Sequence, residues 1–185
     1  MSIVKTVSPA PSQEAEASPI RLGMIVSARF SVSGFARQWA HCHLLANYLG
    51  RYVSANEGDP ERHATMLSTF VNELLEIVYR NHAGDGQIEL TFRKKSGRVL
   101  LQATVPISES QRMFYRMAVQ LVGQPDLKTW YRARLEDPAE GEDTMLGLLE
   151  LVAVYGCNVA MTENAGESRV TLSLHLPEFD DMGEV

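Results

Sequence analysis

The sequence predicts an α+β fold: a two-layer α/β sandwich in which helices cover one face of a mixed, five-stranded sheet. Two observations carry this prediction. Five segments alternate apolar and polar residues with the period of a strand, and the longer segments between them repeat apolar residues at helical spacing. The order is strand, helix, helix, hairpin, further helices, hairpin. We expect the second face of such a sheet to be partly exposed to solvent or covered by a partner.

The first three elements occupy the N-terminal half of the folded region. Residues 21–32 alternate loosely between apolar and polar, which indicates a half-buried strand. Residues 35–53 keep the spacing of one amphipathic helix, and we expect it to be continuous. Asp59 is then placed as an N-cap and Pro60 as the first residue of a second helix, because the missing N–H of proline costs nothing there. This helix is predicted to end near Asn81.

The second half of the chain yields two hairpins with helices between them. Ser108 and Gln111 have the spacing of a capping box at the start of one helix. Gly156 is placed to stop the last helix. The other expected elements are a hairpin over 88–92 and 99–105, a segment of less regular pattern over 127–135, a helix over 143–155, and strands over 157–162 and 168–176 joined by a turn at 164–166.

Length and composition favour one domain with a tail at each end. A chain of 185 residues with 45% hydrophobic residues buries one core of ordinary size. We expect a single domain over residues 21–176. Residues 1–20 contain three prolines and no long apolar run, which predicts a disordered arm, and residues 177–185 form an acidic tail.

Charge and cysteine usage narrow the classes of partner. A net charge of -6 argues against nucleic acid or an anionic membrane as the main partner, because both require a basic surface. Cys42 and Cys157 stand among apolar residues, which is typical of reduced, buried thiols in an intracellular protein. Since no signal sequence or membrane span is evident, we expect a cytoplasmic protein.

The stretch FVNELLEIVYRNHAGDGQIELTF, with the order of elements around it, resembles the ATP-binding fold of histidine kinases and of the anti-sigma-factor serine kinases. The resemblance covers residues 24–176. In that histidine-kinase-like ATPase fold, the second long helix carries an Asn that coordinates the magnesium bridging the nucleotide phosphates.

The resemblance allows two registers on this helix. In the first, Asn72 and Glu76 take the two polar positions, with Glu76 as a possible magnesium ligand, since a carboxylate is a suitable hard ligand. In the second, Glu73 and Ile77 take them, which would abolish metal binding. We prefer the first register. A third interpretation, in which these side chains form the solvent-facing edge of an ordinary core helix, stands beside both.

The other nucleotide-binding boxes of this family are altered. Where the family places an Asp for the adenine amino group, this chain has Pro106 or Ile107, and neither offers a side-chain acceptor. Only Gly147 resembles the glycines of the phosphate loop, so a bound nucleotide would contact Asn72, Glu73, Glu76 and Gly147. That loop also carries five carboxylates, which would repel a triphosphate: Glu136, Asp137, Glu140, Glu142 and Asp143. We expect no strongly bound cofactor and at most weak binding of Mg-ATP.

Three functions follow from these observations. The preferred one is a signalling regulator of anti-sigma or partner-switching type, which binds another protein on a degenerate ATPase scaffold and is not an efficient ATPase or kinase. The second is an active serine/threonine kinase with an altered Mg-ATP site. The third is a histidine phosphotransfer protein that uses His41 or His43. These two histidines project about 200° apart on a helix, so they cannot share one metal ion.

The partner is expected to be a protein, such as a sigma factor, an anti-sigma antagonist or a response regulator. Residues 130–135 occupy the place of a mobile lid in the resembling family, and their aromatic and arginine side chains are suited to anchor a partner: Trp130, Tyr131, Arg132 and Arg134. An uncovered sheet face or edge also predicts a homodimer. His82, at the end of the second helix, is explained by the helix dipole.

Overall fold

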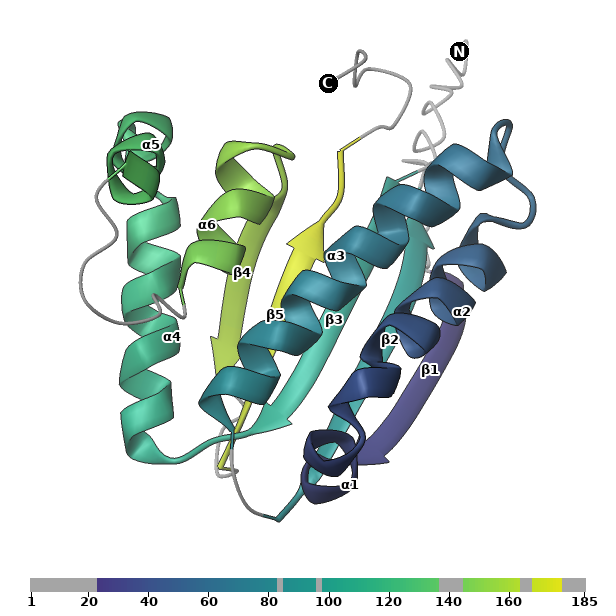
Figure 1. Cartoon of the computed structure of the whole chain (residues 1–185), viewed down its shortest axis with the longest axis horizontal. Coiled ribbons are helices and arrows are strands. Elements are labelled where there is room, and N and C mark those ends of the chain that lie inside the picture. The colour runs from purple at the N-terminus through teal and green to yellow at the C-terminus, as the bar shows by residue number, and fades with distance from the viewer. Residues whose placement is uncertain (1–22, 83–84, 96–97, 137–144, 164–167, 178–185) are drawn as a thin grey trace, which may run out of the picture.

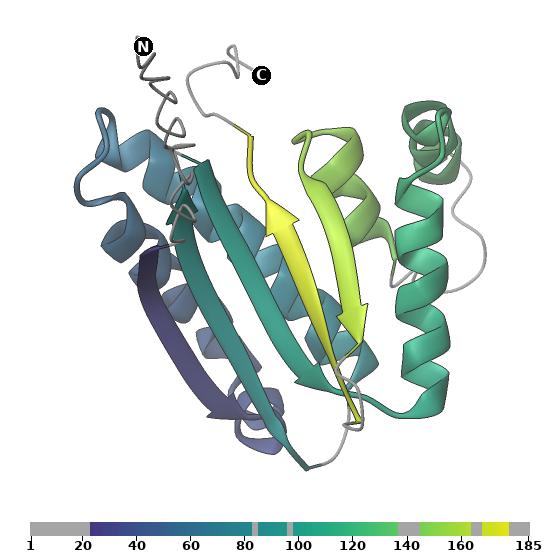
Figure 2. The same ribbon diagram turned by 180° about the vertical axis from the view of Figure 1, so that it is seen from behind.

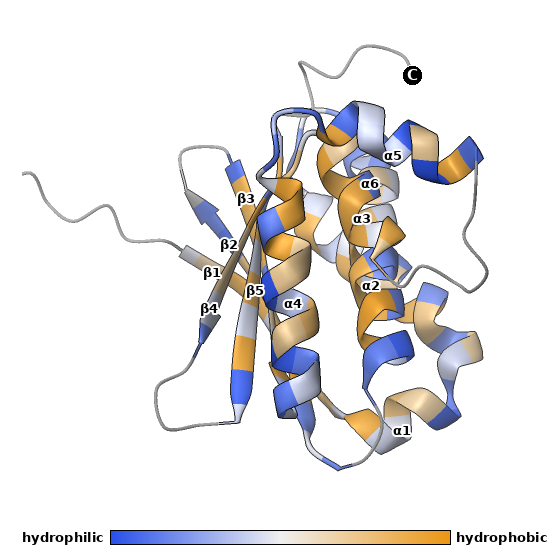
Figure 3. Cartoon of the chain, turned by 90° about the vertical axis from the view of Figure 1, so that its left-hand side faces the viewer, coloured by the Kyte–Doolittle hydropathy of each residue, from blue (hydrophilic) through white to orange (hydrophobic). Residues whose placement is uncertain are grey.

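The computed structural model describes residues 23–82, 85–95, 98–136, 145–163 and 168–177. The predicted arm over residues 1–20, the turn at 164–166 and the acidic tail beyond residue 177 lie outside these ranges. Figures 1 and 3 show a sheet with helices on one side, which confirms the predicted two-layer sandwich. In chain order the elements are β1 (Gly23–Ser31), α1 (Val32–Arg37), η1 (Trp39–His41), α2 (Cys42–Ser54), α3 (Pro60–Asn81), β2 (Gln87–Lys95), β3 (Arg98–Pro106), α4 (Glu109–Val122), α5 (Leu127–Glu136), α6 (Leu146–Ala153), β4 (Asn158–Glu163) and β5 (Arg169–His175).

The sheet has the order β1-β2-β3-β5-β4, and every neighbouring pair is antiparallel. It was predicted to be mixed, and that detail is wrong. The reason is the position of β5. The chain returns from β4 through a hairpin, and β5 inserts between β3 and β4 (Figure 2). The strands β3 and β4 run in the same direction but are never paired, so no parallel ladder forms.

The second long helix, α3, begins and ends where the sequence indicates. Asp59 caps it, accepting a hydrogen bond from the Arg62 N–H at 3.1 Å, and Pro60 is its first residue. It runs diagonally across the sheet (Figure 1). The helix α2 packs tightly against it at Gly50, where an added Cβ would lie 2.6 Å from the Ala64 carbonyl oxygen. A glycine is therefore required at this crossing.

The helix predicted as continuous over residues 35–53 is broken. Ser31 caps α1 by accepting from the Gly34 N–H at 3.0 Å, so the helical conformation begins directly after β1. Gln38 then leaves it (φ -117°, ψ 29°), and η1 leads into α2. The Trp39 ring stacks on Tyr79 with centroids 4.4 Å apart, and this tertiary contact accompanies the break. The periodicity of the sequence did not reveal the turn because apolar residues occur on both sides of it.

The C-terminal half follows the expected order. The capping box is present: Ser108 accepts from the Gln111 N–H, and the Gln111 side chain accepts from the Ser108 N–H. The helix predicted over 143–155 is described as the shorter α6, and residues 143 and 144 lie outside the described ranges. Gly156 follows with φ +70°, the left-handed conformation expected of a glycine that ends a helix.

The core lies between the helices and the inner face of the sheet, as the colouring of Figure 3 shows. Both cysteines are buried and unpaired, as predicted. None of the described helices is long and apolar enough to cross a membrane. The largest fully buried side chains are Tyr115, Phe70, Phe92, Leu49, Leu67, Leu74, Leu75, Ile88, Leu90, Leu101, Leu148 and Leu149.

The outer face of the sheet is polar, and side-chain hydrogen bonds connect its neighbouring strands. The Thr104 and Thr171 hydroxyls lie 2.9 Å apart, and the Gln102 side chain donates to Ser173 at 3.1 Å. Glu89 accepts from Arg29 at 3.0 Å at the β1 side. Such cross-strand pairs stabilise a solvent-facing sheet. This face therefore needs no apolar cover.

Candidate functional site

The two predicted registers on α3 correspond to two different sides of the helix. The Asn72 side chain accepts a hydrogen bond from the Cys42 thiol, with Sγ and Oδ1 3.5 Å apart, so it lies toward α2. Burial raises the pKa of the Cys42 thiol to about 12, with a further contribution from Glu76, which keeps the thiol protonated as a donor. Glu76 accepts from Arg80 at 2.5 Å. Asn72 and Glu76 therefore already have partners within the protein.

Glu73 lies on the other side, against α6. A Cβ added to Gly147 would lie 3.0 Å from the Glu73 carboxylate and 3.6 Å from Ile77, so Gly147 permits close contact between α6 and α3. Burial raises the pKa of Glu73, and the nearby Glu150 and Glu76 carboxylates raise it further. The structure thus places the four predicted nucleotide contacts in two groups: Asn72 with Glu76, and Glu73 with Gly147.

The surroundings of Glu150 complete an acidic contact between α3, α5 and α6. Burial raises the pKa of Tyr131, and the Glu150 carboxylate, which is hydrogen-bonded to it, raises it further. Burial and the same carboxylate also raise the pKa of Tyr155. Tyr155 in turn packs edge-on against Phe70, with centroids 5.3 Å apart. A nucleotide phosphate placed between α3 and α6 would meet Glu73 and Glu150, two groups of its own sign.

No group of three or more His, Cys, Asp or Glu side chains in the described part of the chain is placed to hold a metal ion. Glu76, the predicted magnesium ligand, forms an ion pair with Arg80. The carboxylates at residues 137–143 belong to a segment outside the described ranges. His41 and His43 are both exposed, on η1 and α2.

Pro106 and Ile107, the residues predicted at the adenine position, serve the fold. Pro106 ends β3, and Gly86, at φ +133°, lies so close to it that an added Cβ would be 2.6 Å from the proline ring. Ile107 is buried, and its N–H donates to the Ser168 carbonyl at 2.9 Å. Neither side chain offers an acceptor to a purine.

The four residues predicted to anchor a partner divide into two groups. Tyr131 is 8% exposed and packs with α6, so it fastens α5 to the body. Trp130 and Arg132 are exposed, and the Arg134 guanidinium lies 5.8 Å from the centre of the Trp130 ring, a cation–π contact. The surface that α5 offers is therefore Trp130, Arg132 and Arg134, with Leu135 beside them.

His82 has a different role from the one predicted. It is buried, and its Nε2 lies 2.8 Å from the Tyr115 hydroxyl. The imidazole ring also forms a hydrogen bond with the backbone of Pro106. Because proline has no N–H, the ring donates to the Pro106 carbonyl, and Nε2 therefore accepts from the Tyr115 hydroxyl. Burial lowers the pKa of His82 to about 4, which keeps it neutral at pH 7. A charge–dipole interaction, which requires the cation, therefore does not explain it.

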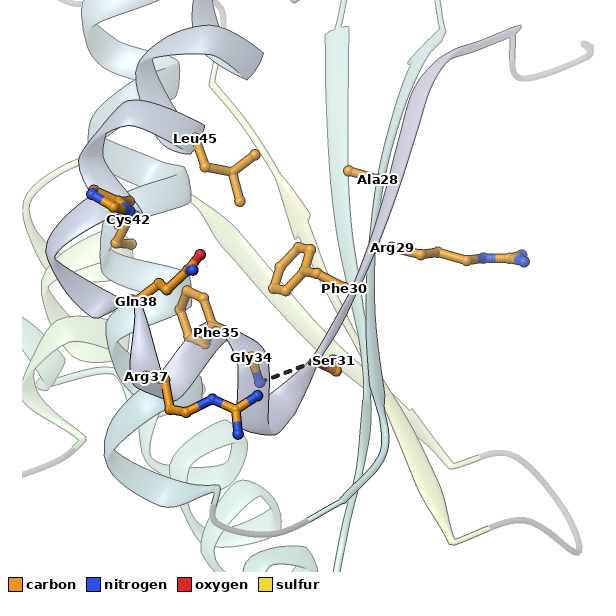
Figure 4. A pocket seen from close by; sticks show the side chains of 11 residues that line it. Ala28, Arg29, Phe30, Ser31, Gly34, Phe35, Arg37, Gln38, Cys42 and Leu45 are labelled. Atoms are coloured by element: carbon orange, nitrogen blue, oxygen red, sulfur yellow. Dashed lines mark hydrogen bonds between the residues drawn. The ribbon is translucent and has the colours of Figure 1, made fainter.

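The sequence did not predict a crevice that the structure forms between β1 and the helices α1 and α2. At the carboxyl end of β1 it opens into a cavity of about 460 Å³. Figure 4 shows Phe30, Phe35, Gln38 and Leu45 around this space, whereas Arg29 points away from it. A second cavity of about 410 Å³ lies at the amino end, between Ile25 and Tyr52.

An exposed apolar stripe on α2 accompanies this crevice. Leu44, Tyr48 and Tyr52 follow one another at intervals of four residues and are 55%, 64% and 52% exposed. The two tyrosine rings stack with centroids 6.3 Å apart. Their regular spacing was visible in the sequence, but it was masked by the longer apolar pattern of the same helix. One helical face is buried against α3, and a second apolar face remains open.

Comparison with protein-family models gave no match, and comparison with curated proteins gave none either. Among solved structures, the chain is similar to a chain in the crystal structure of the SiaB-SiaC complex from Pseudomonas aeruginosa. The TM-score is 0.51 at 18% sequence identity, over 83% of this chain and 89% of that chain. Similarity at this level shows a common fold.

Proposed function

We propose that this protein is a cytoplasmic signalling regulator that works by binding another protein, in the manner of an anti-sigma factor or a partner-switching component. The similar solved structure is that of a complex between two proteins, which supports a protein partner. The degenerate ATPase scaffold is part of the same proposal. Its candidate partners are a sigma factor, an anti-sigma antagonist or a response regulator.

The contact between α3 and α6 is the observation that carries this proposal. In a working member of the resembling ATPase family, polar groups of the second helix hold a metal and a triphosphate. Here Glu73 and Glu150 lie on that side, Gly147 brings α6 against them, and Asn72 and Glu76 are engaged by Cys42 and Arg80. An anionic lining disfavours a polyanion, so activity through protein binding fits better than turnover of ATP.

A titration with Mg-ATP tests this choice. We expect no shift of the melting temperature at millimolar Mg-ATP, since a ligand stabilises only the state that binds it. The alternative, a serine/threonine kinase with a magnesium site at Glu76, requires a clear stabilisation that disappears in Glu76→Ala. That pair of results would overturn the proposed function.

The partner surface on α5 gives the positive test. Trp130→Ala and Arg132→Glu alter exposed side chains and should leave the melting temperature unchanged while weakening binding of the physiological partner. Arg51→Ala, on α2, is the matched control for loss of an exposed arginine. Equal binding by all variants would remove α5 from the interface.

Two further predictions remain proposals. For phosphotransfer at His41 or His43, the test is incubation with a phosphorylated response regulator and detection of acid-labile phosphate. For a homodimer, the test is sedimentation velocity over a range of concentrations. The polar ladder on the outer face gives a second copy little apolar area to bury there.

A further inference from the structure

The strand β1 presents a free edge in the described part of the chain. It pairs with β2 on one side, and no described strand pairs with its other side. Nine residues long and without proline, it exposes a row of backbone donors and acceptors suited to another strand. Proteins normally protect such an edge, so an open one of this length points to a binding role.

The crevice beside this edge is suited to apolar side chains. Its larger cavity is lined by Ala28 and Phe30 of β1 and by Phe35 and Leu45 of the facing helices (Figure 4). A strand added to β1 would direct alternate side chains toward the helical layer, as β1 itself does. At least one of those side chains would enter the cavity.

The charge around the crevice is positive, although the whole chain is acidic. Residues 23–56 include three arginines and no Asp or Glu. Arg37 lines the larger cavity and is exposed. Two carboxylates near the crevice are each paired with a cation: Glu57 with Lys94 and Glu76 with Arg80.

We propose that the β1–α2 crevice binds an extended segment of a partner protein, which adds a strand to β1, places an apolar side chain in the cavity and directs a carboxylate to Arg37. This inference rests on the proposed function and names the chemistry of the partner. The stripe of Leu44, Tyr48 and Tyr52 extends the apolar surface beyond the crevice, so that residues flanking the added strand are also covered.

A second copy of this chain fits the same surface less well. Two copies joined edge to edge by a twofold axis place the carboxyl end of one β1 against the amino end of the other. Arg37 would then approach the amino end of the crevice in the other copy, where Glu57 is already paired with Lys94. The strand β1 of a second copy carries no carboxylate for Arg37, whereas an acidic segment supplies one.

Selection from a phage-displayed library of random dodecapeptides on the full chain tests the proposal. We expect the enriched peptides to alternate, with apolar residues at every second position and Asp or Glu between them. Synthetic copies should bind Arg37→Glu about fivefold more weakly, which is the scale of an exposed ion pair. Ala28→Trp, which fills the cavity, should abolish binding, and melting curves verify that each variant is folded.

Two controls make the result specific. Arg132→Glu reverses an exposed charge on α5 and should leave peptide binding unchanged. Peptides with Lys in place of Asp and Glu should bind Arg37→Glu better than the original chain. No enrichment, no acidic bias, or equal binding by Arg37→Glu would each overturn the proposal, as would a homodimer in sedimentation that Ala28→Trp dissociates.

The outcomes separate this inference from the proposed function. If Mg-ATP stabilises the protein and this effect depends on Glu76, the proposal of a regulator that works without nucleotide is contradicted. The peptide result would still hold in that case. Loss of the physiological partner only in the α5 variants, together with no selected peptide, would retain the regulator and reject the crevice as its docking surface.

Discussion

The two edges of the sheet differ in what covers them. At the β4 edge, α4 lies alongside the strand, and Arg112 and Arg116 each donate to the Glu163 carboxylate at 2.6 Å (Figure 2). At the β1 edge, α2 packs on α3 and leaves a crevice beside the strand. One edge is closed by a helix and ion pairs, and the other is open and lined by apolar side chains.

This difference separates a structural edge from a binding edge. An uncovered edge risks aggregation, and a covering helix with charged anchors removes that risk at β4. The same cover at β1 would exclude a partner. We therefore expect changes at the β4 side to affect stability, and changes in the β1 crevice to affect binding.

Removal of the anchor of α4 should have the largest effect. Tyr115 is fully buried, and its hydroxyl donates to His82. Tyr115→Ala should lower the free energy of unfolding by about 4 kcal/mol, because it leaves a large cavity under α4. Urea denaturation measures this loss, and hydrogen exchange of β4 amides reports whether the edge opens.

Tyr115→Phe is the matched control. It keeps the ring and removes the hydroxyl, so the cost is that of one unpaired buried acceptor on His82, about 1–2 kcal/mol. Equal losses for the two variants would show that packing of the ring does not hold α4 in place.

Acid should weaken the same anchor. The pKa of His82 is lowered to about 4 by burial, against about 6.5 in an unfolded chain. Between these values the unfolded state binds a proton and the folded state does not. The stabilisation is complete above pH 6.5 and decreases as the pH falls to 4, by about 3 kcal/mol in total.

Urea denaturation at a series of pH values measures this decrease. His82→Gln removes the titrating group and retains a side chain that can form hydrogen bonds, so its profile between pH 4 and 6.5 should be flatter. A wild-type profile as flat as that of the variant would contradict the neutral, buried state of His82.

A change on the β1 side tests whether α2 depends on α3. Gly50→Ala places a Cβ 2.6 Å from the Ala64 carbonyl oxygen and 2.6 Å from the Ser68 hydroxyl. Separation of the two helices should lower stability by about 1–3 kcal/mol. Gly58→Ala meets no atom within 4 Å and serves as the control in thermal melts.

The ion pairs at the β4 edge should contribute least. Hydrogen bonds from Arg116 and Arg112 lower the pKa of Glu163, so their stabilisation is present at neutral pH and is lost as the pH falls through that lowered pKa. Glu163→Gln should reduce stability slightly at pH 7 in low salt. The difference should vanish in 1 M NaCl, where exposed charges are screened.

Local sequence signals predicted the order of elements and several of their ends. Asp59 and Pro60 start α3, Ser108 and Gln111 start α4, and Gly156 follows α6 in the left-handed conformation. Each signal acts over a few residues, through a hydrogen bond or an allowed backbone angle. For that reason it can be recognised without knowledge of the rest of the fold.

The sequence by itself therefore determined which segments are helices and strands and that they form a two-layer sandwich. Only the tertiary structure decided that the sheet is antiparallel, that the first helix breaks at Gln38, and that Asn72 and Glu73 lie toward different helices. It also created the crevice beside β1. These features depend on contacts between segments far apart in the chain, and a periodic pattern shows which residues are buried without showing what they contact.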